Sequence, residues 1–311
     1  MKSDRGATFA FMKRFQMMRP FLVLACIGWL LCVGCGMATG KAESASHETV
    51  KDGEWFYHAF DDTQKKVYDA FRASSEDPFG QALIPLAIDK GEDGGESGIP
   101  IAEIDTVYQG FLYDHPELFW LATTYSYQLA GLDADGGEMA DAVAVIPISE
   151  TPEALAAHKE AFEAAAKEFL TGIGDPDSDR EYAKAVYERM AGTIEYTGEA
   201  MYDDAMQMQH TAYGALVEQK AVCDGFALAY RYLLSQRGIP CLVVPGESEG
   251  NPHTWNIAKW DGAWHEMDLT FDASLRDAGG SQYFDLTTEE MQADHQRETN
   301  GIAVLIPITD D

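Results

Sequence analysis

Three residues in the second half of the chain have the side chains of a thiol-dependent acyl-transfer site: Cys223, His253 and Asp268. In such a site a thiolate attacks a carbonyl carbon, a histidine moves the protons, and a carboxylate orients the histidine. A single cysteine would be weak evidence, because free cysteines are commonly buried and inert. The three types together, in this order, predict a Cys-His-Asp catalytic triad.

The sequence after Cys223 predicts a helix that begins at this cysteine. Apolar residues recur at helical spacing over 226–234, and Gly238 and Pro240 mark the end. Unpaired N–H groups at a helix N-terminus carry partial positive charge, so we expect a lowered thiol pKa and an oxyanion-binding backbone N–H at Cys223. The sequence identifies no second oxyanion donor, and packing is the expected role of Trp255.

The other cysteine in the body of the chain, Cys241, lies in the apolar run IPCLVV, which predicts a buried strand. The predicted helix between the two cysteines is about 20 Å long. A disulfide needs α-carbons within about 7 Å. We therefore expect Cys241 in the core and Cys223 unpaired.

His253 and Asp268 lie on a predicted β-hairpin whose turn is Asp261-Gly262. With a two-residue turn, residue 260 pairs with 263, so Trp255 faces Asp268 and His253 faces Thr270. Alternate residues share a face of a strand. His253 and Asp268 are therefore expected as diagonal neighbours on one face, within contact distance.

Two other histidines are expected outside the site. The same register places His265 opposite Ala258, on the other face of the hairpin, and His210 has no evident acidic partner. A zinc site is the alternative interpretation of a cysteine with several histidines. Because the chain beyond the export segment has no CxxC or HExxH spacing, we predict neither a metal nor another cofactor.

The stretch 210–272 resembles the transglutaminase-like superfamily, a branch of the papain-like fold. The resembling segments are 213–216 (YGAL), 222–227 (VCDGFA), 253–256 (HTWN), 261–262 (DG) and 268–272 (DLTFD). The resemblance implies an α+β core in which a helix carrying the cysteine packs on an antiparallel sheet carrying the histidine and aspartate. It also implies that Cys223 is the nucleophile, His253 the general base and Asp268 the orienting acid.

The N-terminus predicts export. Residues 1–38 contain a basic stretch and then a short apolar run over 21–34, typical of a signal peptide and too short to favour a membrane-spanning helix. Cys35 follows a small residue at the end of the run, which resembles a bacterial lipobox and implies lipidation. The alternative is simple cleavage after Ala38. We expect a tether over 39–53, an N-terminal α+β domain over 54–150 and the catalytic domain over 151–311.

The net charge of the 311-residue chain is −30, and since the first 35 residues carry +4, the remainder carries −34. Such acidity argues against nucleic-acid binding, which needs a basic surface. We expect a protein outside the cytoplasm, either anchored to the cell membrane through its N-terminus or secreted. The predicted activity is hydrolysis of a protein or peptide substrate, with peptidoglycan as a further candidate. Protein crosslinking and a non-catalytic scaffold are the alternatives.

Overall fold

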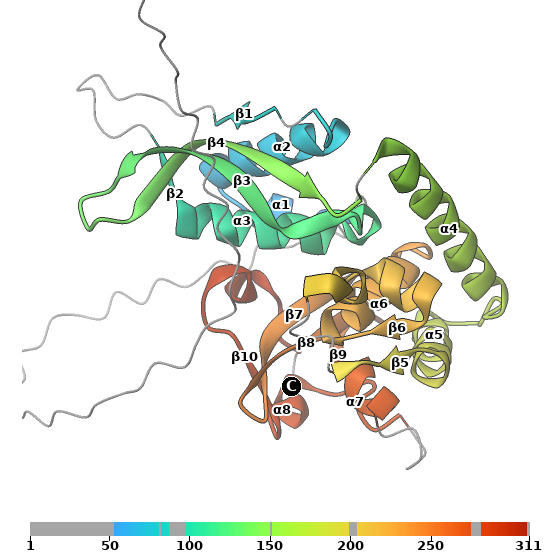
Figure 1. Cartoon of the computed structure of the whole chain (residues 1–311). Coiled ribbons are helices and arrows are strands. Elements are labelled where there is room, and N and C mark those ends of the chain that lie inside the picture. Colours follow the sequence, from blue (N-terminus) through green and yellow to red (C-terminus); the bar gives the residue numbers. More distant parts are fainter. Residues whose placement is uncertain are drawn as a thin grey trace, which may run out of the picture.

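The computed structural model describes residues 53–80, 82–86, 98–149, 151–198, 204–274 and 281–309. Cys35, the predicted export segment and residues 39–52 of the predicted tether lie outside these ranges. The described part is a mixed helix and sheet structure, as predicted, with two four-stranded sheets (Figure 1). The proposed boundary between an N-terminal and a catalytic domain stays a prediction.

The first sheet and its helices come from the N-terminal part of the chain. Strand β4 (Glu138–Pro147) pairs antiparallel with β3 (Leu121–Leu132) and also with the short strands β1 (Ile84–Pro85) and β2 (Ile99–Pro100). Three helices accompany this sheet: α1 (Trp55–Ala59), α2 (Asp62–Glu76) and α3 (Ile101–Asp114). Aromatic side chains such as Phe71, Tyr108 and Tyr125 pack between them.

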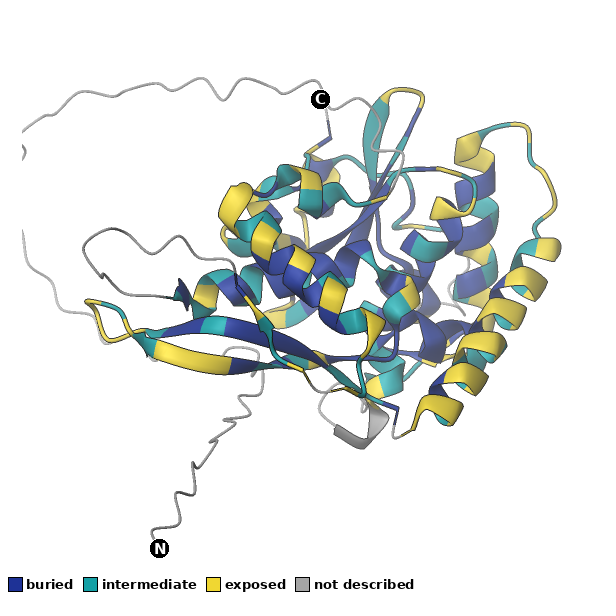
Figure 2. Ribbon diagram, turned by 90° about the horizontal axis from the view of Figure 1, so that it is seen from above, coloured by how far each residue is buried: buried dark blue, intermediate teal, exposed yellow. Residues whose placement is uncertain are grey.

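Two helices and several short elements connect the sheets. Helix α4 (Pro152–Thr171) begins after Thr151, whose hydroxyl accepts the Ala154 N–H at 3.1 Å. Helix α4 is largely exposed at the edge of the molecule (Figure 2). No helix in the described ranges combines the length and apolar character that a membrane crossing needs. The elements that follow are α5 (Asp179–Thr193), β5 (Glu195–Tyr196), the 3-10 helix η3 (Asp204–His210), the π-helix η4 (Gly214–Glu218) and β6 (Lys220–Ala221).

The second sheet is antiparallel in the order β10-β7-β8-β9. Its strands are β7 (Cys241–Ser248), β8 (Asn251–Trp260), β9 (Ala263–Met267) and β10 (His295–Arg297). Helix α6 (Cys223–Ser235) packs against β8, through the Asn256 amide that donates to the Ala227 carbonyl oxygen at 3.0 Å. The remaining elements are α7 (Leu269–Ser274), α8 (Thr288–Met291) and the 3-10 helix η6 (Gly301–Leu305).

A buried ion pair joins the two parts of the fold. Arg231 of α6 donates to the carboxylate of Asp114, at the end of α3, at 3.0 Å. The same carboxylate accepts hydrogen bonds from the Phe56 N–H at 2.9 Å and the Tyr68 hydroxyl at 3.1 Å. The apolar residues of both parts form one continuous core. The second sheet and α6 therefore rest on the N-terminal elements.

Candidate active site

The β8–β9 hairpin has the predicted register. Trp260 pairs with Ala263 and Ala258 with His265. The predicted pairing of His253 with Thr270 is wrong, because β9 ends at Met267. The physical reason is that the Asp268 carboxylate accepts the Thr270 N–H at 2.8 Å, which turns the chain into helix α7 instead of extending the strand.

His253 and Asp268 nevertheless meet, as the hairpin predicts. The His253 Nε2 lies 2.7 Å from the Asp268 Oδ2, and both side chains are buried. Burial alone would raise the pKa of Asp268, but the charges and hydrogen bonds of His253 and His295 lower it to about 2. Asp268 is thus an anion that can orient the ring and stabilise its protonated form. Because Nε2 is engaged, Nδ1 is the nitrogen left for a thiol.

Cys223 is the first residue of α6, as predicted. The preceding Val222 N–H donates to the Gln209 carbonyl oxygen at 3.0 Å, which anchors the start of the helix. A Cβ on Gly225 would lie only 2.4 Å from that oxygen, so only glycine permits this close approach. The glycine two positions after the cysteine therefore fixes where the thiol sits.

Thr254 connects Cys223 to the strand that carries His253. The Thr254 hydroxyl donates to the Asp224 carboxylate at 2.9 Å, and hydrogen bonding by Thr254 lowers the pKa of the Cys223 thiol. Since Thr254 adjoins His253 in β8, these bonds hold the start of α6 beside the histidine. All three predicted triad residues are therefore on neighbouring elements, within one buried region.

The expected lowering of the thiol pKa is wrong for this environment. Cys223 is only 4% exposed, and burial, with the negative charge of Asp224, raises its pKa to about 12, although hydrogen bonds from Thr254 oppose the shift. Desolvation of the anion outweighs the partial charges of the helix N-terminus. The resting side chain is thus a thiol, and a thiolate forms only when a neighbouring base accepts the proton.

Cys241 is the core residue that the sequence predicts. It begins β7, is 3% exposed, and is a free cysteine, as is Cys223. Its carbonyl oxygen accepts a hydrogen bond from the buried Arg231. Cys241 therefore belongs to the packing of α6 on the sheet.

The two histidines expected outside the site have different outcomes. His265 faces Ala258, as predicted, and its Nδ1 lies 2.8 Å from an Asp285 carboxylate oxygen. The expectation that His210 lacks an acidic partner is wrong, because its Nδ1 lies 3.0 Å from the Asp224 carboxylate. Folding brings η3 against the start of α6, a contact between elements that the sequence pattern does not reveal.

Trp255 has the packing role expected of it. Its ring stacks on His253 at a centroid distance of 6.2 Å, and its indole N–H donates to the buried Glu266 carboxylate at 2.6 Å. Because this N–H is already used, it is not the second oxyanion donor. The Cys223 backbone N–H at the start of α6 is the donor that the helix geometry provides.

Sequence reasoning missed His295, a third residue that contacts the His253–Asp268 pair. Its Nε2 lies 2.9 Å from the same Asp268 Oδ2, and its side chain is fully buried in the three-residue strand β10. The three groups could in principle hold a metal ion, since one atom of each lies within 4.8 Å of the others. The facing atoms, however, are at hydrogen-bond distances and already satisfy one another.

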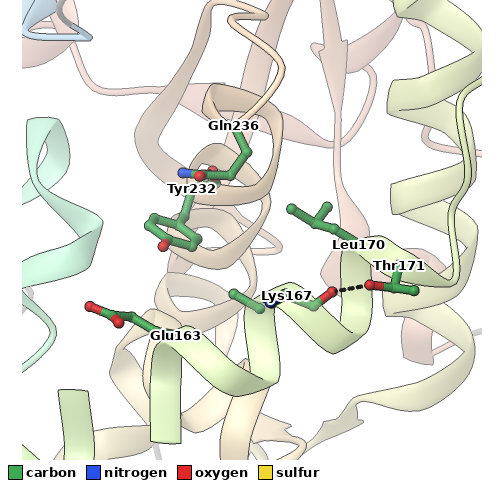
Figure 3. Close-up of a pocket in the computed structure, with 7 residues that line it drawn as sticks. Glu163, Lys167, Leu170, Thr171, Tyr232 and Gln236 are labelled. Atoms are coloured by element: carbon green, nitrogen blue, oxygen red, sulfur yellow. Dashed lines mark hydrogen bonds between the residues drawn. The ribbon is translucent and has the colours of Figure 1, made fainter. Parts of the chain in front are cut away.

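A pocket of about 600 Å³ opens beside this cluster. Its lining includes His253, Thr270, Phe271, Tyr283 and Asp294, whereas Cys223 is not among the described residues that line it. A second pocket, of about 320 Å³, lies between α4 and the end of α6 and is lined by Glu163, Lys167 and Tyr232 among others (Figure 3). Only the first pocket reaches a predicted triad residue.

Comparisons with known proteins agree with the resemblance seen in the sequence. Residues 164–269 match the family described as Transglutaminase-like superfamily. Kyphoscoliosis peptidase of Mus musculus is 30% identical over 129 residues, and that of Homo sapiens 29% over 130 residues; each alignment covers 38% of this chain and 19% of the relative. The chain thus spans about a fifth of the length of these curated relatives.

A solved structure described as a TGase is 20% identical and has a TM-score of 0.34, over 51% of this chain and 47% of that one. The family match begins within α4 and ends just after Asp268, and so includes the helix start at Cys223 and the hairpin. Residues 164–269 are therefore similar to the transglutaminase-like superfamily.

Proposed function

We propose that the protein is a thiol-dependent acyl-transfer enzyme that hydrolyses a peptide or carboxamide bond. Cys223 is the nucleophile, His253 the general base and Asp268 the residue that orients the histidine. The observation that carries the proposal is the 2.7 Å hydrogen bond between Asp268 and His253 of β8. The next residue of β8, Thr254, is bonded to Asp224, which follows Cys223 in α6.

The mechanism begins from the neutral thiol. His253 Nδ1 accepts the thiol proton while the sulfur attacks the substrate carbonyl, and the Cys223 N–H stabilises the oxyanion. The His253 imidazolium then donates that proton to the leaving amine, the C–N bond breaks, and a thioester remains. Water attacks the thioester with His253 as base, the C–S bond breaks, and a carboxylic acid and the thiol are released.

A second candidate is protein crosslinking, in which a primary amine replaces water in the last step. The pocket beside His253 favours this outcome, because its lining includes the acidic Glu249 and Asp294 and the aromatic Tyr196, Phe271 and Tyr283. Carboxylates and aromatic faces attract an ammonium group. A non-catalytic scaffold is the third candidate, and the satisfied His253–Asp268 pair next to a free cysteine argues against it.

The proposed setting is outside the cytoplasm, with lipidation at Cys35 or secretion, and envelope proteins, peptides or peptidoglycan as substrates. Support comes from the N-terminal sequence, namely the basic stretch, the short apolar run and Gly34-Cys35. The acidity of the remainder of the chain favours protein substrates over nucleic acid.

The test is to incubate the purified full chain with a peptide library and a fluorescent primary amine, and to analyse the products by mass spectrometry. We expect new peptide termini with the wild type and with Cys241→Ala, and none with Cys223→Ala. Amine-modified peptides that depend on Cys223 would indicate crosslinking. Products that persist in Cys223→Ala, or their absence with wild-type protein, would contradict the proposal.

A further inference from the structure

The Asp268 carboxylate oxygen that bonds His253 also bonds a second histidine. Oδ2 lies 2.7 Å from the Nε2 of His253 and 2.9 Å from the Nε2 of His295. The other oxygen, Oδ1, accepts the N–H groups of Thr270 at 2.8 Å and Phe271 at 3.3 Å. The carboxylate is thus held from both ends, and His295 provides the side-chain contact opposite the triad histidine.

Both nitrogens of His295 face carboxylates. Nδ1 lies 2.6 Å from an Asp294 oxygen, on the far side of the ring from Asp268. A neutral imidazole has one N–H and one bare nitrogen, and a bare nitrogen against an anion is unfavourable. Although burial lowers the pKa of His295, the hydrogen bonds that it donates to the Asp268 and Asp294 carboxylates, together with their negative charges, outweigh burial and raise the pKa above its usual value.

The other titratable groups around His295 do not compete for its protons. His253 lies at a ring-centroid distance of 5.4 Å, and Tyr283 at 5.8 Å directs its hydroxyl to the Asp294 carboxylate at 2.6 Å. The remaining ring neighbours, Trp255 and Phe271, are uncharged. An imidazolium between Asp268 and Asp294 is therefore the form that satisfies every partner.

The backbone holds His295 firmly in place. His295 pairs with Ser248 in the β10–β7 register, and the Ser248 hydroxyl donates to the Asp294 carbonyl oxygen at 2.9 Å. A Cβ on Gly246 would lie 2.4 Å from the Gln296 carbonyl oxygen, so only glycine there lets β10 approach β7. Strand β10 is thus built against the sheet at the point that places His295 behind Asp268.

We propose that His295, backed by Asp294, is a positioning residue that orients the Asp268 carboxylate toward His253 and, as an imidazolium, sets the charge that the catalytic pair experiences. The inference deepens the proposed function, on which it depends. The positive charge of the His295 imidazolium partly offsets the negative charge of Asp268. Less negative charge then opposes ionisation of the Cys223 thiol. Loss of the charge would make the thiolate harder to form.

The test is the pH dependence of Cys223 alkylation by iodoacetamide in the full chain, followed on the Cys223 peptide by mass spectrometry. His295→Gln keeps a donor toward Asp268 but removes the charge, and Asp294→Asn weakens the charge while keeping the histidine. We expect both variants to move the alkylation midpoint to higher pH, with the larger shift for His295→Gln. His265→Gln, which loses an equivalent histidine–aspartate contact on the other hairpin face, is the control and should leave the midpoint unchanged.

A second measurement separates orientation from folding. We expect His295→Ala to lower the alkylation rate at neutral pH about tenfold, the effect of losing one charge-assisted hydrogen bond, and His295→Gln to recover most of it. Suppose that the His295 and Asp294 variants have unshifted alkylation midpoints while the wild-type reaction of Cys223 depends on His253. That result would overturn the role of His295 and leave the proposed function intact. A wild-type reaction independent of His253 would instead overturn the proposed function.

Discussion

The Cys223 thiol lies where two effects oppose each other. It sits at the N-terminus of a 13-residue helix, which favours the thiolate, but burial and Asp224 raise its pKa to about 12. The direction of the net shift shows that burial is the larger effect. Ionisation of Cys223 therefore depends on a neighbouring base that accepts its proton, which is the role proposed for His253.

Sequence reasoning at the residue scale works where a residue belongs to a local pattern. Cys223 follows from a helical repeat, and the relation of His253 to Asp268 follows from a two-residue turn. His295 has no such pattern, because it lies 27 residues beyond Asp268 in a strand of three polar residues. Its position depends on β10 pairing with β7, a long-range contact that periodicity does not specify.

At the scale of elements, the contact between η3 and the start of α6 fixes the depth of Cys223. Gly225→Ala would place a Cβ 2.4 Å from the Gln209 carbonyl oxygen and 3.1 Å from that of Thr211. Because both neighbours are backbone atoms, one element must move. We expect a loss of unfolding free energy on the order of 1–3 kcal/mol, as for other overpacked sites, measured by urea denaturation.

Gly192→Ala is the matched control, since Gly192 lies inside α5 and an added Cβ meets no atom within 4 Å. That variant should gain about 0.5–1 kcal/mol from the better helix propensity of alanine. Equal stability of Gly225→Ala and wild type would show that η3 is not seated as tightly as the structure describes.

Elements with strong local sequence signals match their predictions closely, and where a prediction is wrong the structure shows the physical reason. The helical spacing after Cys223 and the Asp261-Gly262 turn produce the predicted α6 and β8–β9 hairpin. The strand predicted through Thr270 ends early, because Asp268 caps a helix with the same carboxylate that holds His253. Spacing alone does not reveal that one side chain performs both roles.

At the scale of the whole molecule, Asp114 and Arg231 join the N-terminal elements to the helix that carries Cys223. Burial raises the pKa of Asp114 to about 6, and Arg231 opposes the shift without cancelling it. The folded state then binds this proton more tightly than the unfolded chain. Its contribution to stability is fully present below about pH 4 and is lost as the pH rises through 6.

We expect this residue to lower the unfolding free energy by up to about 3 kcal/mol between pH 4 and pH 6.5, since each pKa unit corresponds to about 1.4 kcal/mol. Asp114→Asn cannot ionise and should lack that decline in urea titrations across this pH range. Asp69→Asn, which removes an exposed partner of Arg72, should keep it. A decline that persists in Asp114→Asn would assign the pH dependence to other groups.

The segment 114–120 (DHPELFW) contains a long-range contact that the sequence pattern does not reveal. The segment leads from the end of α3 into β3, which begins at Leu121. The contact between Asp114, at the end of α3, and Arg231 of α6 joins residues 117 positions apart, and no local pattern specifies it. The N-terminal part therefore contacts the helix that carries Cys223.

The most direct test of the central claim is the pH dependence of Cys223 alkylation in wild type and His253→Ala. If His253 accepts the thiol proton, wild-type Cys223 should react near neutral pH, and His253→Ala should move the midpoint upward by more than one unit, toward the raised pKa of the buried thiol. Cys241, buried without a base, should stay unreactive in both. Identical curves for the wild type and His253→Ala would contradict the triad.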